Sequence, residues 1–300
     1  MTQIDASIGR IACSAIATCS MALAACGEGG GTIASASMPI AAPQVPASAP
    51  PAAVRPSQTS GTYLAISTQP GQLTITVDKA TGTYSLTSTD PTILPVNQAS
   101  LTQVHSGSGL QGTTLPSGDR VKSYLWLWQI GSAQHVDMGE WLYQVLAPAP
   151  DDTEKKTVLT YFVFGDRTPA ADMPLTGRAT YSRVATNLAC DCYATINLSA
   201  DFGAGSIATT LAAVGQMFDG RDHDLQASGQ GSISTTGTFG LGLAGTSKAA
   251  VTSGGTETLA VNGRMDGAFF GPKAGEIGGA FALQTPQGDR FFGTFAGAKD

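Results

Sequence analysis

Charged side chains are scarce in this sequence, because Asp, Glu, Lys and Arg together make up only 13% of its 300 residues. Helices of water-soluble proteins usually carry many charged residues along their exposed faces, so this scarcity argues against a mainly helical protein. Glycine is abundant instead, with 37 residues, and short runs of alternating apolar and polar residues recur along the chain. The composition therefore predicts an all-β fold.

Positive charge is also limited. The chain has 16 Lys and Arg residues against 22 Asp and Glu residues, which gives a formal net charge of −6, and the basic residues form no cluster. A surface that binds nucleic acid needs a basic patch or stripe. The sequence therefore excludes nucleic acid as an expected partner.

Histidine is rare, and its pattern does not suggest catalysis. The three histidines, His105, His135 and His223, lack metal-ligand spacing, and no G-x-S-x-G motif is present. Residues 240–245 match G-x-G-x-x-G by letters, but hairpin-like sequence follows them rather than the helix that a dinucleotide site requires. The sequence therefore predicts a protein that is not an enzyme and has no resident metal or cofactor.

The first 25 residues are typical of a secretory leader. Arg10 precedes an apolar run that is too short for a permanent membrane anchor and ends in Leu-Ala-Ala-Cys26. This ending resembles the lipobox of bacterial lipoproteins, which implies that residues 1–25 are a signal peptide and that Cys26 is acylated, with palmitate among its acyl chains. Gly27 follows, rather than Asp, which favours the outer membrane. An ordinary signal peptide with a chance cysteine is the alternative.

After Cys26, the mature chain contains only Cys190 and Cys192. An oxidising compartment would allow them to form a disulfide. Side chains two residues apart in a strand lie about 6–7 Å from each other, so a disulfide needs a turn at this point. A disulfide and two free thiols both stay open, whereas two thiols without a nearby histidine are too few ligands for a metal.

Composition divides the mature chain into three parts. Residues 26–58 are rich in Ala, Pro and Ser and cannot build a core, so we expect a tether. Residues 59–168 are expected to form an N-terminal β-rich handle domain with strands near 62–67, 73–77, 83–87, 121–130, 140–146 and 157–164.

Residues 169–300 are expected to form a second domain that begins where Pro169 and Pro174 interrupt the strand pattern. Its eight candidate strands lie near 176–183, 193–202, 206–214, 223–233, 236–243, 257–269, 276–283 and 290–296. Eight strands suffice for a small closed antiparallel barrel filled by side chains. The polar alternate positions predict a soluble barrel rather than a lipid-facing one.

The tryptophans gather in the first domain and are the candidate ligand-binding residues. Trp126 and Trp128 share one strand face with Tyr124, and Trp141 lies on the next strand. These rings either form the core of the domain or make an exposed surface that anchors a partner. We place the ligand on this domain, because the alternate positions of the barrel are mainly Gly, Ala, Ser and Thr.

Haem is a further candidate ligand. His135 lies in the expected connection between two strands of the first domain, beside the tryptophans. It could bind haem iron from one side, with His105 as the opposite axial ligand.

Residues 267–281 have the pattern G-x-F-x-G-P-x-A-x-E-x-G-G-x-F, and a last aromatic run follows at 290–295. This pattern resembles the closing hairpin of the β-barrel domain in transferrin-binding protein B and its relatives among Gram-negative surface lipoproteins. The resemblance extends upstream through 174–181 and 198–203. The matching positions are Gly267, Phe269, Gly271, Pro272, Ala274, Glu276, Gly278, Gly279 and Phe281.

The resemblance implies a non-enzymatic, lipid-anchored protein of the outer membrane that is displayed on the cell surface by a dedicated outer-membrane translocator. It implies a host or environmental ligand, a protein or haem, captured for iron or haem acquisition. The full transferrin receptor has two lobes, and this chain has room for one. The alternative is a structural or adhesive envelope lipoprotein that makes protein–protein contacts only.

Overall fold

The computed structural model describes residues 60–68, 71–78, 80, 83–90, 99–101, 113–128, 130, 133–189, 191–216, 220–251 and 254–300. The expected signal peptide, Cys26, the tether, His105 and Cys190 lie outside these residues. Almost all described elements are strands, so the all-β prediction is confirmed. Within the described residues, no helix has the length and apolar character needed to cross a membrane.

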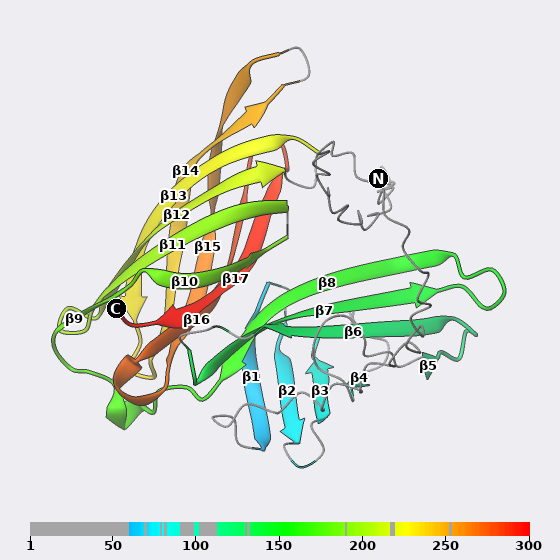
Figure 1. Ribbon diagram of the computed structural model, residues 1–300, viewed down its shortest axis with the longest axis horizontal. Coiled ribbons are helices and arrows are strands. Elements are labelled where there is room, and N and C mark those ends of the chain that lie inside the picture. The colour runs from blue at the N-terminus through cyan, green and yellow to red at the C-terminus, as the bar shows by residue number, and fades with distance from the viewer. Residues whose placement is uncertain are drawn as a thin grey trace, which may run out of the picture. The chain divides into compact units, whose positions relative to one another are not determined.

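The first sheet has eight antiparallel strands in the order β4-β3-β2-β1-β8-β7-β6-β5 (Figure 1). Strand β1 pairs with both β2 and β8, so it joins the first strands of the chain to the long pair β7 and β8. The strands are β1 (Gly61–Ser67), β2 (Leu73–Asp78), β3 (Thr83–Ser88), β4 (Ala99–Leu101), β5 (Thr113–Thr114), β6 (Arg120–Trp128), β7 (Val136–Leu146) and β8 (Glu154–Gly165).

The second sheet is the barrel, with nine strands in the order β10-β17-β16-β15-β14-β13-β12-β11-β9 (Figure 1). Two 3₁₀ turns accompany it: η1 (Ala170–Asp172) precedes the barrel, and η2 (Pro272–Ala274) lies in the connection between β15 and β16. The strands are β9 (Arg178–Tyr181), β10 (Arg183–Leu188), β11 (Asp191–Asp201), β12 (Ser206–Gln216), β13 (Asp222–Ile233), β14 (Thr238–Ala250), β15 (Thr256–Phe270), β16 (Glu276–Gln284) and β17 (Arg290–Ala298).

Eight of the nine strands correspond to the expected ones, and β10 is additional, because the expected strand near 176–183 ends at Tyr181 as β9 and a second part, β10, follows Ser182. The first part of this divided strand, β9, pairs with β11, whereas its second part, β10, pairs with β17 at the other end of the sheet. The Thr186 hydroxyl of β10 also donates a hydrogen bond to the Ala194 carbonyl of β11, at 3.3 Å. The divided strand therefore links the first and last full strands of the barrel.

Each sheet has its own apolar core. The handle core contains Trp141, Tyr143, Phe162 and Phe164, all buried, together with inward residues of β1, β2, β3 and β6. In the barrel, Phe269 is fully buried among other rings, and its centroid lies 5.5 to 6.0 Å from those of Tyr181, Phe202 and Phe239. Large rings over small neighbours thus fill the barrel, as expected of a small closed sheet.

A third apolar cluster joins the two sheets. Val136, Met138 and Val163 of the handle pack with Phe270 and Ala296 of the barrel. All five are buried, so the two sheets share apolar contacts. The boundary near residues 169–175 falls in the segment between β8 and β9, and the division into two independent domains stays a prediction.

Candidate binding face and the junction beneath it

Alternating side chains of β6 point to opposite faces of the handle sheet. Leu125 and Leu127 point into the handle core, whereas Tyr124, Trp126 and Trp128 lie on the outer face. Tyr124 and Trp126 stack, with ring centroids 5.7 Å apart and planes inclined by 13°. Trp128 is 37% exposed. A row of three rings, two half-buried and the last exposed, therefore follows one strand.

The neighbouring strands extend this row. The register places Leu142 of β7 beside Tyr124 and Leu159 of β8 beside Leu142, and both leucines are half-buried. We call the surface formed by Tyr124, Trp126, Trp128, Leu142 and Leu159 the aromatic face. The apolar rings and side chains make it the candidate binding surface of the handle.

Glu140 borders the aromatic face on the side of the barrel. The register places it between Trp126 of β6 and Tyr161 of β8. Burial raises the pKa of the Glu140 carboxyl, and the side-chain amide of Asn187 on the barrel opposes that rise. Burial, and then the nearby Glu140 charge, raise the pKa of the Tyr161 hydroxyl.

The barrel continues this surface through β17. The ring of Tyr161 lies 6.1 Å from that of Phe292, and the guanidinium carbon of Arg290 lies 5.6 Å from the centre of the Phe292 ring. Arg290 is exposed. Both sheets therefore contribute side chains near the aromatic face.

Trp141 belongs to the opposite face. It pairs with Leu125, is 1% exposed, and donates a hydrogen bond from Nε1 to the Ser123 hydroxyl at 2.7 Å. Because an indole in this position cannot touch a ligand, Trp141 drops out of the candidate binding residues. Each of the two interpretations thus holds for different tryptophans: Trp141 is in the core, and Trp126 and Trp128 are on the outer face.

His135 lies at the junction of the two sheets. A Cβ atom built on Gly271 would lie 2.6 Å from its ring, so the imidazole packs directly against that glycine. Gly271 has a φ of +67°, which an L side chain rarely adopts. The structure therefore gives His135 a packing role. His105 lies outside the described residues, so its part as the opposite haem ligand stays a prediction.

Glu276 holds the connection that contains His135. The buried carboxylate accepts hydrogen bonds from the backbone N–H groups of Gln134, His135 and Val136, at 2.6, 2.8 and 3.0 Å. Three donors on one carboxylate form a charge-assisted cluster. Glu276 begins β16 of the barrel, whereas the donors belong to the handle, so this side chain joins the two sheets.

Three backbone carbonyls of the motif at 267–281 accept hydrogen bonds near the same junction. The Thr168 hydroxyl donates to the Gly271 carbonyl at 2.6 Å, and the Thr168 N–H donates to the Phe269 carbonyl at 3.0 Å. The Tyr181 hydroxyl donates to the Ala274 carbonyl at 2.7 Å. The carbonyls around η2 are therefore occupied by Thr168, in the segment that leads from the handle into the barrel, and by Tyr181 of β9.

The remaining sequence candidates lie at one end of the barrel strands. Cys192 is in a disulfide, and its pairing with Cys190 stays a prediction because Cys190 is not described. Next to it, Tyr193 is 92% exposed and pairs across the hairpin with Val214. His223 is buried, with Nδ1 2.8 Å from the Ser247 hydroxyl. Across the described ranges, no three His, Cys, Asp or Glu residues lie together in a metal-binding arrangement.

Sequence reasoning missed the roles of Glu140 and Glu276. The sequence could have pointed to Glu140, because it is a charged residue in a strand whose other residues near it are mainly apolar. Glu276 was noted only as a position of the family pattern, and its function depends on backbone groups about 140 residues earlier in the chain, such as Val136. No local pattern reports such a contact.

Comparison with protein families gives one match. Residues 173–299 match the model that describes the C-lobe and N-lobe β-barrels of transferrin-binding protein B. A search of curated proteins finds no match. The matched segment begins just before β9 and ends in the last residues of the chain.

Solved structures resemble the chain over a longer range. Transferrin-binding protein B of Haemophilus parasuis, a vaccine antigen, aligns with 79% of this chain at 17% identity and a TM-score of 0.39. Intact Ap-TbpB, with its N and C lobes, aligns with 79% at 16% identity and a TM-score of 0.42. The chain spans 44% and 46% of these two proteins. It spans 100% of the N-lobe domain of lactoferrin-binding protein B from Moraxella bovis, at 15% identity and a TM-score of 0.34.

Proposed function

Because residues 173–299 form a β-barrel of the transferrin-binding protein B type, we propose that this protein is an outer-membrane surface lipoprotein that captures a protein ligand. The family match is the observation that carries the proposal, since the relatives named above are binding proteins for transferrin and lactoferrin. We assign the capture step to iron or haem acquisition. The proposal needs no catalytic residue.

The aromatic face is the proposed binding surface. A few large side chains usually supply most of the binding energy of an interface, and Trp and Tyr are enriched among them. Trp126 and Trp128 lie on the outer face of a broad sheet, where a flat protein surface can reach both. Haem binding favours a closed pocket with a histidine that is available to the iron, whereas His135 packs against Gly271.

Membrane attachment is proposed through lipid on Cys26. The apolar leader ends directly before this residue, and the segment from 26 to 58 is long enough to hold the folded part several tens of Å from the bilayer, at about 3 Å per extended residue. Display on the cell surface would require a translocator in the outer membrane. We include that translocator as a second partner.

Affinity capture tests the proposed function. The full-length protein in detergent is immobilised and offered iron-loaded transferrin, iron-loaded lactoferrin and free haem separately, followed by a mixed panel of host proteins. We expect saturable binding of one protein and no six-coordinate haem spectrum. Binding of haem, with loss of its spectrum in His135→Ala, would replace the protein ligand by haem. Weak contacts with many proteins and no saturation would favour the structural or adhesive lipoprotein.

A further inference from the structure

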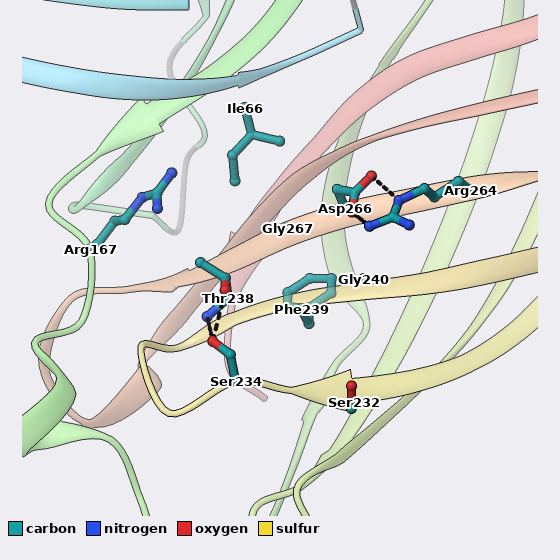
Figure 2. A pocket seen from close by; sticks show the side chains of 10 residues that line it. All are labelled: Ile66, Arg167, Ser232, Ser234, Thr238, Phe239, Gly240, Arg264, Asp266 and Gly267. Atoms are coloured by element: carbon teal, nitrogen blue, oxygen red, sulfur yellow. Dashed lines mark hydrogen bonds and ion pairs between the residues drawn. The ribbon is translucent and has the colours of Figure 1, made fainter. Parts of the chain in front are cut away.

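A pocket of about 350 Å³ lies where the handle meets the barrel wall, away from the residues of the aromatic face. Ile66 of β1 and Arg167, which follows β8, line it from the handle side, and the barrel side is formed by β13, β14 and β15 (Figure 2). This volume is at the lower end of the range for small-molecule sites, about 300–1,000 Å³. Neither the family match nor the proposed function uses it.

One arginine of the pocket is already neutralised. Arg264 donates from Nε and Nη2 to the two carboxylate oxygens of Asp266, each at 2.6 Å. This fork-to-fork pair also raises the pKa of Arg264. Figure 2 shows the pair on one side of the pocket and Arg167 on the other.

Arg167 has no such partner. Its one hydrogen bond within the described residues runs from Nη2 to the Leu64 carbonyl at 3.3 Å, and none of those residues forms an ion pair with it. The residue is half-buried, and this burial lowers the pKa of its guanidinium. Counting Arg167, Arg264 and Asp266, the pocket carries one net positive charge.

The rest of the lining combines hydroxyls with apolar surface. Ser232 and Thr238 supply hydroxyl groups and Ile66 supplies apolar atoms (Figure 2), whereas the ring of Phe239 packs in the barrel core. Gly240 keeps the space open, because a Cβ atom there would lie 2.8 Å from Arg264 Nη2 and 2.9 Å from Asp266 Oδ1. The contacts are with the mobile ends of side chains, so a larger residue at this strand position would push the pair into the pocket rather than break the sheet.

We propose that this pocket binds an acidic sugar through its carboxylate. The single unpaired guanidinium of Arg167 suits one carboxylate, which it can bind in a bidentate manner. Ser232 and the outer edges of the Arg264–Asp266 pair offer donors and acceptors for ring hydroxyls, and Ile66 offers an apolar surface for ring carbons. A phosphate dianion would call for a second unpaired cation, and the lining has none among the described residues.

Titration of the full-length protein in detergent tests this site with glucuronate as the probe. Glucose serves as the neutral control of the same ring size, and inorganic phosphate as the control anion. We expect saturable binding of glucuronate and none of glucose or phosphate at the same concentrations. The natural ligand could be the end of a glycan or a free acidic sugar, and a short oligosaccharide with a terminal glucuronate distinguishes them. Tighter binding than free glucuronate indicates the end of a glycan, and weaker binding indicates the free sugar.

Two variants tie the binding to the pocket by different means. Arg167→Gln should weaken glucuronate binding at least about tenfold, because it removes a charge-assisted pair. Gly240→Val should do the same by pushing the Arg264–Asp266 pair into the pocket, while Arg167 and its charge stay unchanged. The matched control is Arg178→Gln, which removes an exposed, Asp201-paired arginine elsewhere on the barrel and should leave affinity unchanged. Absence of glucuronate binding, equal binding of phosphate, or full binding by a folded Gly240→Val variant would overturn the proposal.

Discussion

Glu140 is an ionisable side chain whose surroundings disfavour its charge. Its pKa is raised from the usual value of 4.5, chiefly by burial, so the folded protein prefers the neutral acid more than the unfolded chain does. The contribution of Glu140 to the free energy of unfolding is therefore fully present below pH 4.5, and it is lost as the pH rises through the raised pKa of the folded protein. Glu140 therefore costs stability at neutral pH and costs none in acid.

Removing that charge should stabilise the protein in a pH-dependent way. Glu140→Gln keeps the shape of the side chain, and we expect a higher melting temperature than wild type at pH 7.5 and the same one at pH 4. Thermal melts followed by tryptophan fluorescence measure this difference. Glu154→Gln, an exposed position on β8, is the control and should match wild type at both values. A Glu140→Gln variant that melts lower than wild type at pH 7.5 would refute the account of this site.

Cys26 provides a second prediction at the residue scale. Changing it to Ser removes the thiol that would carry the lipid and should move the protein from the membrane fraction to the soluble fraction. Partitioning into detergent after cell lysis measures the change. Cys192→Ser is the matched control, since that cysteine lies in the barrel, and it should stay with the membrane. Retention of the Cys26→Ser variant in the membrane fraction would show that another segment anchors the chain.

At the scale of the elements, the hairpin from β15 to β16 connects the barrel to the handle through Glu276. Glu276→Ala should lower the free energy of unfolding by about 3 kcal/mol, because hydrogen bonds to charged groups contribute about 1.5–3 kcal/mol and Val136 N–H would be left buried. Amide exchange at His135 and Val136 should accelerate as well. Glu154→Ala is the control for the loss of an acidic side chain. Unchanged exchange at these two amides would mean that the connection does not depend on the carboxylate.

The strands show what could be predicted from sequence. Alternation located β1, β2 and β3 within one residue of their observed ends. Every second residue is buried in β2 and β3, and the outward residues Thr62 and Leu64 of β1 are exposed. It missed β10, where half-buried residues such as Thr186 replace a clear apolar row. The resemblance in residues 267–281 is confirmed by the family match over 173–299.

The aromatic residues mark the limit of such prediction. Alternation correctly put Trp126 and Trp128 on one face, but it could not say whether that face points inward. The cross-strand register decides it, by placing Trp141 beside Leu125 and Glu140 beside Trp126. Register depends on long-range pairing that a single sequence does not show.

At the scale of the whole molecule, the two sheets are joined by apolar contacts and by Glu276. We expect residues 174–300 alone to fold, with a β-type circular dichroism spectrum and a cooperative melt, because its edge strands pair through β9 and β10. The fragment should melt at a lower temperature than the full chain, since it exposes Phe270 and Ala296, which the handle covers. A disordered fragment would show that the barrel cannot be separated at this boundary.

The central claim is that a protein ligand binds the aromatic face. Its most direct test is the equilibrium affinity of the captured ligand for the full-length double variant Trp126→Ala/Trp128→Ala, compared with wild type and with Tyr193→Ala. Tyr193 is the control because it is an exposed ring on the barrel and is not one of the five residues of this face. We predict a loss of at least about 2 kcal/mol, roughly 30-fold in Kd, for the double variant and no loss for the control. Unchanged affinity of the double variant, together with a loss in Tyr193→Ala, would contradict the claim and place the ligand on the end of the barrel.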